Sequence, residues 1–517
     1  MQIFRLLYVL FKIRLLTPLG LFRLIAAIYN YGINVMMLLK VAESTYGNKI
    51  AIVDENETIS YKELMTQSEK LSIILNQKYQ VQSGQKVGFL CKNHASLVKS
   101  IFAISLLGSD IYLLNTEMNK SQLNLLFNRH NFDFLIYDVE LSYLIEQSTF
   151  NNNKILSYHT NLPAVNNHLL HSNISGELKI KRTSLSKIIL LTGGTTGISK
   201  EVAHKPSIFN YLNPFLTLLT RLKLLNYNSA YIATPIYHGY GIAVLFLFIV
   251  LGKKVVISNG FDAGKSCSLI RDNKVEVMTV VPLMLHKMMK NNIEDLKSLA
   301  CIASGGAELN PKLAHEVQSN LGDVLYNLYG TSEAGLNLIA TPQDLKYSVH
   351  TIGQKINGVQ LKVLNNNHKK VKANTIGQFC IKTKWSMTNS NNLWIETGDL
   401  GYRDNNGYYF LCGRTDDMVV SAGVNVYPVE LEQVLIKHPL IEDVAVIGIS
   451  DEEFGSRLKA FVHPVRNAEL SKEELVRWLR LRVARFQLPK EIVFIDNIPY
   501  TPVGKIDKKE LKLIHKV

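Results

Sequence analysis

The sequence predicts an α/β protein with a large N-terminal α/β domain of mixed, mainly parallel sheets and a small C-terminal α+β domain. From residue 46 to about residue 300, short apolar runs alternate with segments of helical periodicity, which is typical of parallel strands joined by crossover helices. From residue 441 onward the pattern shrinks to short strands and one clear helix. Hydrophobic residues make up 47% of the chain and charged residues 19%, which indicates a globular protein.

The expected elements follow the chain in order. A strand, a turn and a second strand lead to a helix that begins after Ser60, where Glu63 completes a capping pattern. Further strands are predicted at "KVGFL", "DIYLL", "FDFLIYD", "AYIATPI", "KVVIS" and "VEVMTVVP", with a helix at "ASLVKSIFAISLLG". The helix of the small domain is predicted at "SKEELVRWLRLRVA". The polar cluster "CGRTDDM" marks the join, which predicts domains at residues 41–412 and 418–517 with a hinge at residues 413–417.

The net charge and the cysteines indicate what kinds of partner, metal site and cellular compartment to expect. The net charge of +14 favours anionic partners, but no nucleic-acid-binding motif is present, so no nucleic-acid partner is expected. The five cysteines are far apart, without a CxxC pair or a histidine neighbour at metal-ligand spacing. We therefore expect reduced cysteines, no zinc site and a cytoplasmic protein.

The first forty residues differ from the rest of the chain. They contain no acidic residue and five basic ones, namely Arg5, Lys12, Arg14, Arg23 and Lys40. The longest uncharged run, residues 24–39, has 16 residues and includes polar ones, whereas a membrane span needs about 20 apolar residues. Two interpretations stay open: residues 1–40 bind the inner face of the cell membrane peripherally, or they form a helix packed on the body of the protein.

A glycine-rich segment, "TGGTTGISK" at residues 192–200, follows the apolar run "KIILL". Glycines allow close approach of the backbone to a ligand, hydroxyls and amides supply donors, and Lys200 supplies positive charge. This composition suits a polyphosphate, although Ile198 and Ser199 separate Gly197 from the lysine, so the segment is not a P-loop. An ordinary surface loop between strands is the alternative.

Four further segments decide between these interpretations. They are "ASGGAEL" (303–309), "NLYGTSEAG" (327–335), "TGDLGYRDNNGYYFLCGRTDDMVVSAGVNVYPVELE" (397–432) and "IPYTPVGKIDKKEL" (498–511). In this order, the set resembles the adenylate-forming (ANL) superfamily, and among its branches the acyl-CoA synthetases, or fatty-acid–CoA ligases. The resemblance runs from about Tyr46 to the C-terminus.

The resemblance implies ATP, Mg²⁺ and CoA as cofactors and a fatty acid as the further substrate. In this family a carboxylate attacks the α-phosphorus of ATP, diphosphate leaves, and a thiol then displaces AMP from the acyl-AMP. Because an anion meets a tetra-anionic triphosphate, cations and aligned donors must converge on the site. The residues that the resemblance assigns to ATP are Thr192, Gly193, Gly194, Thr195, Thr196, Gly197, Lys200, Gly305, Gly306, Ala307, Glu308, Tyr329, Gly330, Thr331, Ser332, Asp399 and Arg414.

Individual roles also follow from the resemblance. Residues 192–200 would cradle the β and γ phosphates, and Glu333 and Thr192 would hold Mg²⁺, since a hard cation prefers oxygen ligands. Tyr329 would lie along the adenine, and Asp399 would accept the ribose hydroxyls with Arg414 close by. Taken singly, each charged residue has a purely structural alternative. Asp399 could cap a turn, Glu333 could cap a helix, and Lys505 could be a solvated charge.

The C-terminal domain carries the main catalytic residue. The catalytic residues that the resemblance implies are Lys505, His238 and Glu333, with Lys505 on the α-phosphate and the carboxylate. In this family the C-terminal domain rotates after adenylation, and Asp416 matches the hinge position. Contacts to CoA or to the acyl group are assigned to Gly241, Ser421, Ala422 and Gly423.

The segment "TPIYHGYGIAVLFLFIVLGK" follows the glycine-rich loop where the family builds its carboxylate pocket, and His238 matches the position beside the acyl-adenylate. No Asp or Glu occurs between Pro235 and Lys253. An ammonium substrate would lack a partner there, which disfavours an amino acid and leaves an aliphatic acid. The segment does not set the chain length, and with the family resemblance our hypothesis is a medium- or long-chain fatty acid. A packed core histidine is the alternative for His238.

Several positions depart from the family pattern. Ser199 and Glu201 flank Lys200 where proline and glycine are usual, Ser332 replaces a threonine, and Ala422 replaces a glycine that approaches pantetheine. Two alternatives follow. The acyl-adenylate is delivered to a carrier-protein phosphopantetheine, or the chain is a non-catalytic, membrane-associated nucleotide-binding protein.

Overall fold

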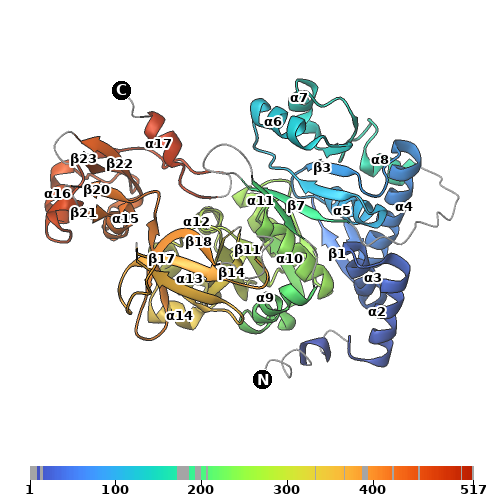
Figure 1. The fold of residues 1–517 in the computed structure, drawn as a ribbon, viewed down its shortest axis with the longest axis horizontal. Coiled ribbons are helices and arrows are strands. Elements are labelled where there is room, and N and C mark those ends of the chain that lie inside the picture. Colours follow the sequence, from blue (N-terminus) through green and yellow to red (C-terminus); the bar gives the residue numbers. More distant parts are fainter. Residues whose placement is uncertain are drawn as a thin grey trace. The chain divides into compact units, whose positions relative to one another are not determined.

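The computed structural model describes residues 8–11, 15–171, 186–192, 200–204, 208–331, 333–365, 367–386, 394–421, 424–451, 455–501 and 504–514 (Figure 1). The chain divides into two compact units, Met1–Ala303 and Ser304–Val517. Strand β12 (Cys301–Gly305) carries the chain from the first unit into the second.

The first unit contains a six-stranded sheet in the order β6-β5-β3-β4-β7-β8. Its strands are β3 (Lys86–Leu90), β4 (Asp110–Leu113), β5 (Phe134–Tyr137), β6 (Asn153–Leu156), β7 (Ile188–Thr192) and β8 (Lys200–His204). All neighbouring pairs are parallel except β7 and β8. The predicted alternation of strands and crossover helices is therefore confirmed in this sheet.

A second group of strands in the first unit runs in the order β11-β9-β10-β1-β2. These are β1 (Ile50–Val53), β2 (Thr58–Ser60), β9 (Ser229–Ile232), β10 (Lys254–Val256) and β11 (Val277–Val280). The pairs β11–β9, β9–β10 and β10–β1 are parallel, and β2 joins β1 antiparallel. Strands β9 and β11 are buried along their whole length, as expected where both faces of a parallel sheet are covered.

The helices of the first unit cover and connect these sheets. They are α2 (Pro18–Tyr31), α3 (Val35–Tyr46), α4 (Tyr61–Tyr79), α5 (Ala95–Leu107), α6 (Lys120–His130), α7 (Ser142–Glu146), α8 (Val165–His171), α9 (Ile208–Arg221), α10 (Gly239–Val250), α11 (Ala263–Asn273) and α12 (Pro282–Asn291), with 3₁₀ turns η1 (Val139–Leu141), η2 (Leu224–Asn226) and η3 (Glu294–Leu296). Helix α5 is buried along its whole length. Such a helix forms part of the core rather than of the surface.

The N-terminal segment forms the helix pair α2 and α3. Thr17 caps α2 by accepting from the Gly20 amide at 3.0 Å, and Asn34 caps α3 by accepting from the Met37 amide at 3.0 Å. Helix α3 is packed into the protein through Met36, Met37 and Leu39. Among the described residues, no helix combines the length and the apolar character needed to cross a bilayer.

Helix α4 begins as the sequence predicts, with a reciprocal cap. The Ser60 hydroxyl accepts from the Glu63 amide at 3.2 Å, and a Glu63 carboxylate oxygen accepts from the Ser60 amide at 2.7 Å. The two hydrogen bonds satisfy amides that the first helical turn leaves without partners.

We expect Ser60→Ala to lower the free energy of unfolding by about 1 kcal/mol, because the Glu63 amide loses its acceptor. Urea unfolding followed by circular dichroism measures this change. Ser121→Ala, at an exposed position of α6, is the control and is expected to stay within about 0.5 kcal/mol of the wild type. An equal effect of the two substitutions would contradict the capping role.

The second unit begins with an antiparallel sheet. Its strands run in the order β16-β17-β18-β19-β15-β14-β13. They are β13 (Leu325–Thr331), β14 (Gly335–Ala340), β15 (Thr351–Lys355), β16 (Gln360–Leu364), β17 (Gly377–Lys382), β18 (Ile395–Arg403) and β19 (Tyr409–Arg414), and helices α13 (Pro311–Leu321) and α14 (Pro342–Tyr347) accompany them. Every pair within this run is antiparallel.

The C-terminal part of the second unit has its own sheet and core, as expected for a small α+β domain. The strands are β20 (Val419–Ser421), β21 (Val424–Val426), β22 (Ile441–Asp451), β23 (Gly455–Pro464) and β24 (Glu491–Phe494), with helices α15 (Pro428–Leu435), α16 (Lys472–Arg480) and α17 (Lys508–Ile514) and the 3₁₀ turn η4 (Arg485–Gln487). Buried residues such as Leu435, Leu458 and Leu475 fill the space between sheet and helices. The predicted domain boundaries at residues 412 and 418 stay predictions.

Candidate active site

The predicted ribose-binding carboxylate lies at the centre of a hydrogen-bonded group in the second unit. Asp399 on β18 is paired in register with Arg414 on β19. The Arg414 Nη1 atom donates to Asp399 Oδ1 at 3.0 Å, and the Tyr329 hydroxyl on β13 donates to Asp399 Oδ2 at 2.5 Å. The consecutive strands β18 and β19 and the distant strand β13 therefore bring together three of the predicted nucleotide-binding residues.

The environment of Asp399 determines its charge. Burial raises the pKa of Asp399, whereas the Tyr329 hydroxyl and the positive charges of Arg414 and Lys505 lower it, and the net pKa is raised. The pKa of Tyr329 is raised well above its usual value by burial and by the neighbouring Asp399 carboxylate. The tyrosine hydroxyl therefore keeps its proton and remains a donor.

Gly398, next to Asp399 in β18, is required by the local backbone conformation. It has φ +74°, and a Cβ at this position would lie 2.8 Å from Arg414 Nη2. Its carbonyl accepts from the Thr415 amide at 2.8 Å, which ties the end of β19 to β18. The guanidinium of Arg414 also donates from Nε to Asp416 Oδ1 at 2.9 Å, so the predicted hinge residue is in contact with the site.

Lys505 is held in a tight turn of the C-terminal part. The Lys505 carbonyl accepts from the Thr501 amide at 2.7 Å, and the Lys505 amide donates to the Thr501 hydroxyl at 3.2 Å. The turn rests on a small core that includes Ile498 and Leu511. The Lys505 side chain is exposed, and its charge is close enough to lower the pKa of Asp399. The structure thus brings the predicted catalytic lysine to the predicted ribose site.

The hairpin β13–β14 positions the predicted magnesium ligand. Gly330 and Gly335 face each other so closely that a Cβ on Gly330 would lie 2.5 Å from the Gly335 carbonyl oxygen. The Thr331 hydroxyl accepts from the Ala334 amide at 3.0 Å, and Glu333 sits half-buried in the same turn. A carboxylate oxygen is a suitable ligand for a hard cation.

The segment after β12 contacts the C-terminal part. Gly306 has φ +85°, and Glu308 Oε1 accepts from Gln433 Nε2 on α15 at 3.2 Å. Lys312 on α13 donates from Nζ to the carbonyls of His438 and Ile441 at 2.8 and 2.6 Å. These contacts, which the sequence did not reveal, join the segment after β12 and the start of α13 to the C-terminal part of the same unit.

The first unit contains other residues that the sequence analysis assigns to ATP. Thr192 ends β7 and Lys200 begins β8, and the two are paired in register at the open end of the hairpin. Predicted residues that lie outside the described part of the chain are Gly193, Gly194, Thr195, Thr196, Gly197, Ser332, Ala422 and Gly423. Ser421, at the end of β20, is buried.

The start of α10 forms the predicted acyl pocket segment. His238 precedes the helix, and its ring stacks at a tilt on that of Tyr237 with centroids 4.6 Å apart. A Cβ on Gly241 would clash with the Pro235 carbonyl, so only glycine fits there. The Tyr240 hydroxyl donates to the Ala303 carbonyl at 2.8 Å, which anchors the first turn of the helix.

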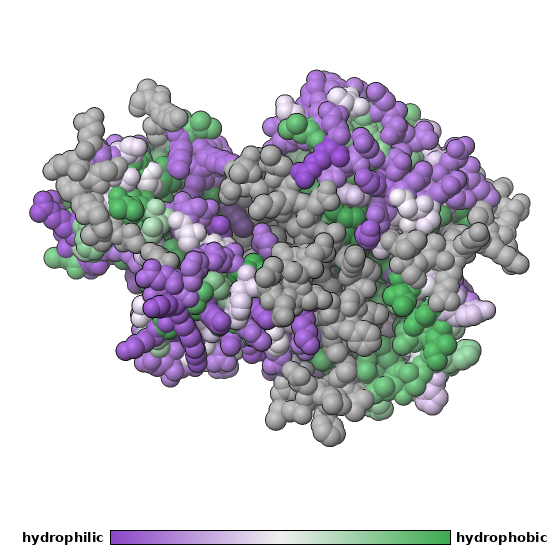
Figure 2. Space-filling view, viewed as in Figure 1, coloured by the Kyte–Doolittle hydropathy of each residue, from purple (hydrophilic) through white to green (hydrophobic). Residues whose placement is uncertain are grey.

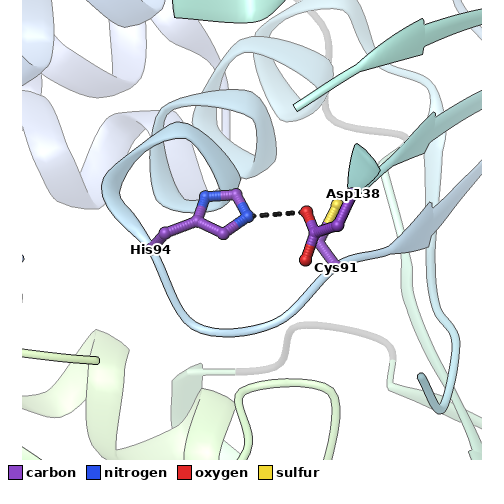
Figure 3. A group of neighbouring side chains, drawn as sticks. All are labelled: Cys91, His94 and Asp138. Atoms are coloured by element: carbon purple, nitrogen blue, oxygen red, sulfur yellow. Dashed lines mark hydrogen bonds and ion pairs between the residues drawn. The ribbon is translucent and has the colours of Figure 1, made fainter. Parts of the chain in front are cut away.

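A buried polar cluster supports this segment and was missed by the sequence reasoning (Figure 3). Asn93 accepts from the Ile236 amide at 2.8 Å and donates to the Thr234 carbonyl at 3.0 Å. The adjacent His94 bonds through Nε2 to Asp138 Oδ1 at 2.9 Å, and its Nδ1 accepts from the Leu97 amide at 3.0 Å. The signal in the sequence was the presence of polar residues directly after two strands, β3 and β5.

The same cluster corrects one expectation. Cys91 does have a histidine neighbour, because ligand atoms of Cys91, His94 and Asp138 lie within 4.8 Å of one another (Figure 3). Both nitrogens of His94 are occupied by hydrogen bonds, and Asp138 also accepts from the Lys92 amide at 2.7 Å and the Ser157 hydroxyl at 2.5 Å. Although burial opposes it, these donors lower the pKa of Asp138. The residues therefore form a saturated structural network rather than a metal site.

Glu432 on α15 makes the C-terminal part sensitive to pH. Burial raises its pKa to about 7, and its Oε1 accepts from the Val446 amide at 2.7 Å. Because the folded pKa exceeds the unfolded one, this group stabilises the fold below the unfolded pKa and loses that contribution as pH rises through about 7.

We expect the free energy of unfolding of the wild type to fall between pH 5 and pH 8 by about 1–2 kcal/mol more than that of Glu432→Gln. The glutamine keeps an oxygen for the Val446 amide, so the hydrogen bond is preserved. Urea unfolding at both pH values measures the difference. Identical pH dependences would contradict the assignment.

The similarities to known proteins agree with this geometry. The family model described as AMP-binding enzyme matches residues 39–389, and the AMP-binding enzyme C-terminal domain matches residues 430–505. The 2-succinylbenzoate–CoA ligase of Bacillus subtilis is 24% identical over 480 residues, which cover 90% of this chain and 95% of the relative.

Solved structures share the fold. The amide bond synthetase McbA from Marinactinospora thermotolerans superposes with a TM-score of 0.80 at 19% identity, covering 93% of this chain and 99% of that one. The o-succinylbenzoate coenzyme A synthetase (MenE) from Bacillus subtilis, solved with ATP and a magnesium ion, gives a TM-score of 0.78 at 23% identity, covering 92% and 99%. The predicted fold class is confirmed, and the predicted ATP, Mg²⁺ and CoA are those that AMP-forming CoA ligases use. With a family model spanning residues 39–389, the chain belongs to the AMP-binding enzymes of the adenylate-forming superfamily.

Proposed function

We propose that this protein is an ATP-dependent acid–CoA ligase that works in two steps. In the first, a carboxylate oxygen of the acid attacks the α-phosphorus of ATP, and the bond to the diphosphate breaks. In the second, the thiol of CoA attacks the acyl carbonyl, AMP leaves with the electron pair of the broken bond, and the thiol proton is released.

The observation that carries this proposal is the convergence on Asp399. Tyr329 and Arg414 hold the two carboxylate oxygens, and the charge of Lys505 reaches the same group from the C-terminal part. A nucleotide whose ribose replaces or shares these donors would have its phosphates near Lys505. The positive charge then favours the pentacoordinate phosphorus, where negative charge develops.

The chain offers suitable groups for the other parts of ATP. Lys200 and Thr192 at the end of the β7–β8 hairpin are proposed to contact the phosphates, and Glu333 and Thr192 are proposed to hold Mg²⁺. When bound, the ion neutralises charge on the triphosphate. Tyr329, whose ring is buried against Phe379 with centroids 6.2 Å apart, is proposed to bound the adenine.

We propose a medium- or long-chain fatty acid as the substrate. The segment 235–252 carries neither an acidic residue nor a lysine or arginine, so neither an ammonium nor a second carboxylate of a substrate would find a partner there. Helix α10 is almost entirely apolar beyond its first turn. The relatives favour a second candidate, an aromatic acid such as 2-succinylbenzoate, which the B. subtilis relative is named for.

One assay separates these substrates. Diphosphate release is measured with ATP and Mg²⁺ across saturated fatty acids, benzoate derivatives and 2-succinylbenzoate, with and without CoA. We expect diphosphate release with fatty acids whether or not CoA is present. We expect acyl-CoA to form only when CoA is added. A preference for 2-succinylbenzoate would show that the substrate is the aromatic acid and not a fatty acid. Diphosphate release with formation of a carrier-protein thioester but no acyl-CoA would show that the acceptor is a carrier protein and not CoA.

The setting proposed for this reaction is the cytoplasm. ATP and CoA are abundant there, and all five cysteines are free and buried, as expected in a reducing compartment. A reaction with a poorly soluble fatty acid would also benefit from access to a membrane surface.

A further inference from the structure

Helix α2 exposes an apolar face, which is the reverse of a normal surface helix. Its outward side chains Leu19, Phe22, Ile25 and Tyr29 are 57%, 68%, 65% and 73% exposed. In Figure 2, hydrophobic residues gather over the region where Figure 1 places α2. Soluble proteins rarely leave so many large apolar side chains contiguous and in contact with water.

Helical geometry places these residues on one side. With 100° per residue, Phe22, Ile25 and Tyr29 point within about 60° of one another, whereas the buried Gly20 and Ala27 point the opposite way. The buried side packs on α3, which is itself fixed in the core. The apolar face of α2 is thus turned away from α3 and exposed.

The charge of the surrounding segment indicates what covers this face. Residues 1–40 contain five basic residues and no acidic one, and the chain as a whole carries a net charge of +14. The first acidic residue, Glu43, is neutralised by Lys40 at 2.8 Å. Glu69 also lies beside α2, where it accepts from the Tyr31 hydroxyl at 2.7 Å. The excess of basic over acidic residues in the segment that carries the apolar face nevertheless favours a bilayer that contains anionic lipids over a protein partner.

We propose that α2 lies in the headgroup region of an anionic membrane, with Leu19, Phe22, Ile25 and Tyr29 immersed in the acyl boundary and Arg23 of the same helix at the headgroups. This supplies the two signals, apolar burial and electrostatic attraction, that stable peripheral binding needs. The surface role rests on the proposed function only in its purpose, which is access to an apolar acid dissolved in the bilayer.

Co-sedimentation with vesicles tests the proposal. The full chain is mixed with vesicles of phosphatidylcholine plus phosphatidylglycerol, and with vesicles of phosphatidylcholine alone. We expect binding to the anionic vesicles that weakens with salt and is weaker on neutral ones. Ile25→Glu and Phe22→Glu are each expected to lower partitioning at least about tenfold, because a carboxylate must enter the apolar boundary.

A matched control separates this face from exposed apolar residues in general. Leu125 on α6 is 67% exposed, so Leu125→Glu makes the same change elsewhere and is expected to leave partitioning within about twofold of the wild type. Thermal unfolding of each variant shows whether it is folded. Equal partitioning of Ile25→Glu and wild type overturns the proposal. The proposal is also overturned if the wild type does not bind vesicles but forms a dimer that Ile25→Glu dissociates. In that case a second copy of the chain covers the apolar face.

The test also separates this proposal from the proposed function. Diphosphate release with a short, water-soluble fatty acid is expected to be unchanged in Ile25→Glu. Vesicle binding without ligase activity would overturn the function alone, and ligase activity without vesicle binding would overturn the membrane role alone.

Discussion

Lys505→Ala is expected to lower acid-dependent diphosphate release by roughly a hundredfold to a thousandfold, with little change in the Kd for ATP. The lysine charge faces a site where negative charge develops only during the reaction, so its removal affects the transition state more than ground-state binding. Steady-state diphosphate release and fluorescence titration with ATP measure the two quantities. The adenylation step is the one affected, so CoA transfer from a preformed acyl-adenylate should be reduced far less.

Lys490→Ala is the matched control for this prediction. Lys490 lies in the same C-terminal part and pairs with Asp451, which is not a predicted site residue, at 2.8 Å. Its removal changes the net charge equally. We expect its diphosphate release to stay within about twofold of the wild type. Equal losses in the two variants, or an unchanged rate in Lys505→Ala, would leave the non-catalytic nucleotide-binding alternative as the better description.

Asp399→Asn is expected to raise the KM for ATP about tenfold to a hundredfold, equivalent to roughly 1.5–3 kcal/mol. The substitution keeps an oxygen for the Tyr329 hydroxyl but removes the charge that pairs with Arg414 and, in our proposal, accepts the ribose hydroxyls. Since the Arg414 side chain is 46% exposed, the fold should tolerate the change. Initial-rate kinetics against ATP concentration and thermal unfolding provide the two readouts.

Asp323→Asn serves as the control for Asp399→Asn. Asp323 pairs with the exposed Lys346 at 2.6 Å, so the same chemical change occurs away from the predicted site. No change in KM is expected. A purely structural role for Asp399 would instead show as a lowered melting temperature with the KM for ATP unaltered.

Local signals in the sequence were sufficient for much of the fold. Ser60 and Glu63 predict the start of α4 because capping depends only on residues three apart. The α16 helix was predicted through residue 484 but ends at Arg480, because the chain turns at Leu481 and the apolar pattern continues into the next segment. The antiparallel order of the second unit was not predicted, because pairs such as β15 with β19 join distant segments that have no local signature.

The candidate site shows the same division. The order of motifs indicated Tyr329, Asp399, Arg414 and Lys505, and the structure brings these four together. The order of motifs did not indicate that Asn93 supports the pocket segment. Nor did it indicate that Cys91 lies beside His94 and Asp138, because Asp138 follows a different strand. Periodicity also did not show that the apolar face of α2 points outward. A helical pattern shows which residues share a face, but not what that face contacts.

The convergence of distant segments on one nucleotide is tested most directly by lysine footprinting. The acetylation rate of each lysine is measured by mass spectrometry with and without ATP, Mg²⁺ and a fatty acid, using Lys154, exposed on β6, as the internal reference. We predict that the ligands slow acetylation of Lys505 several-fold and leave Lys154 unchanged. Equal acetylation of Lys505 with and without ligands, under conditions where ATP is shown to bind, would contradict the account.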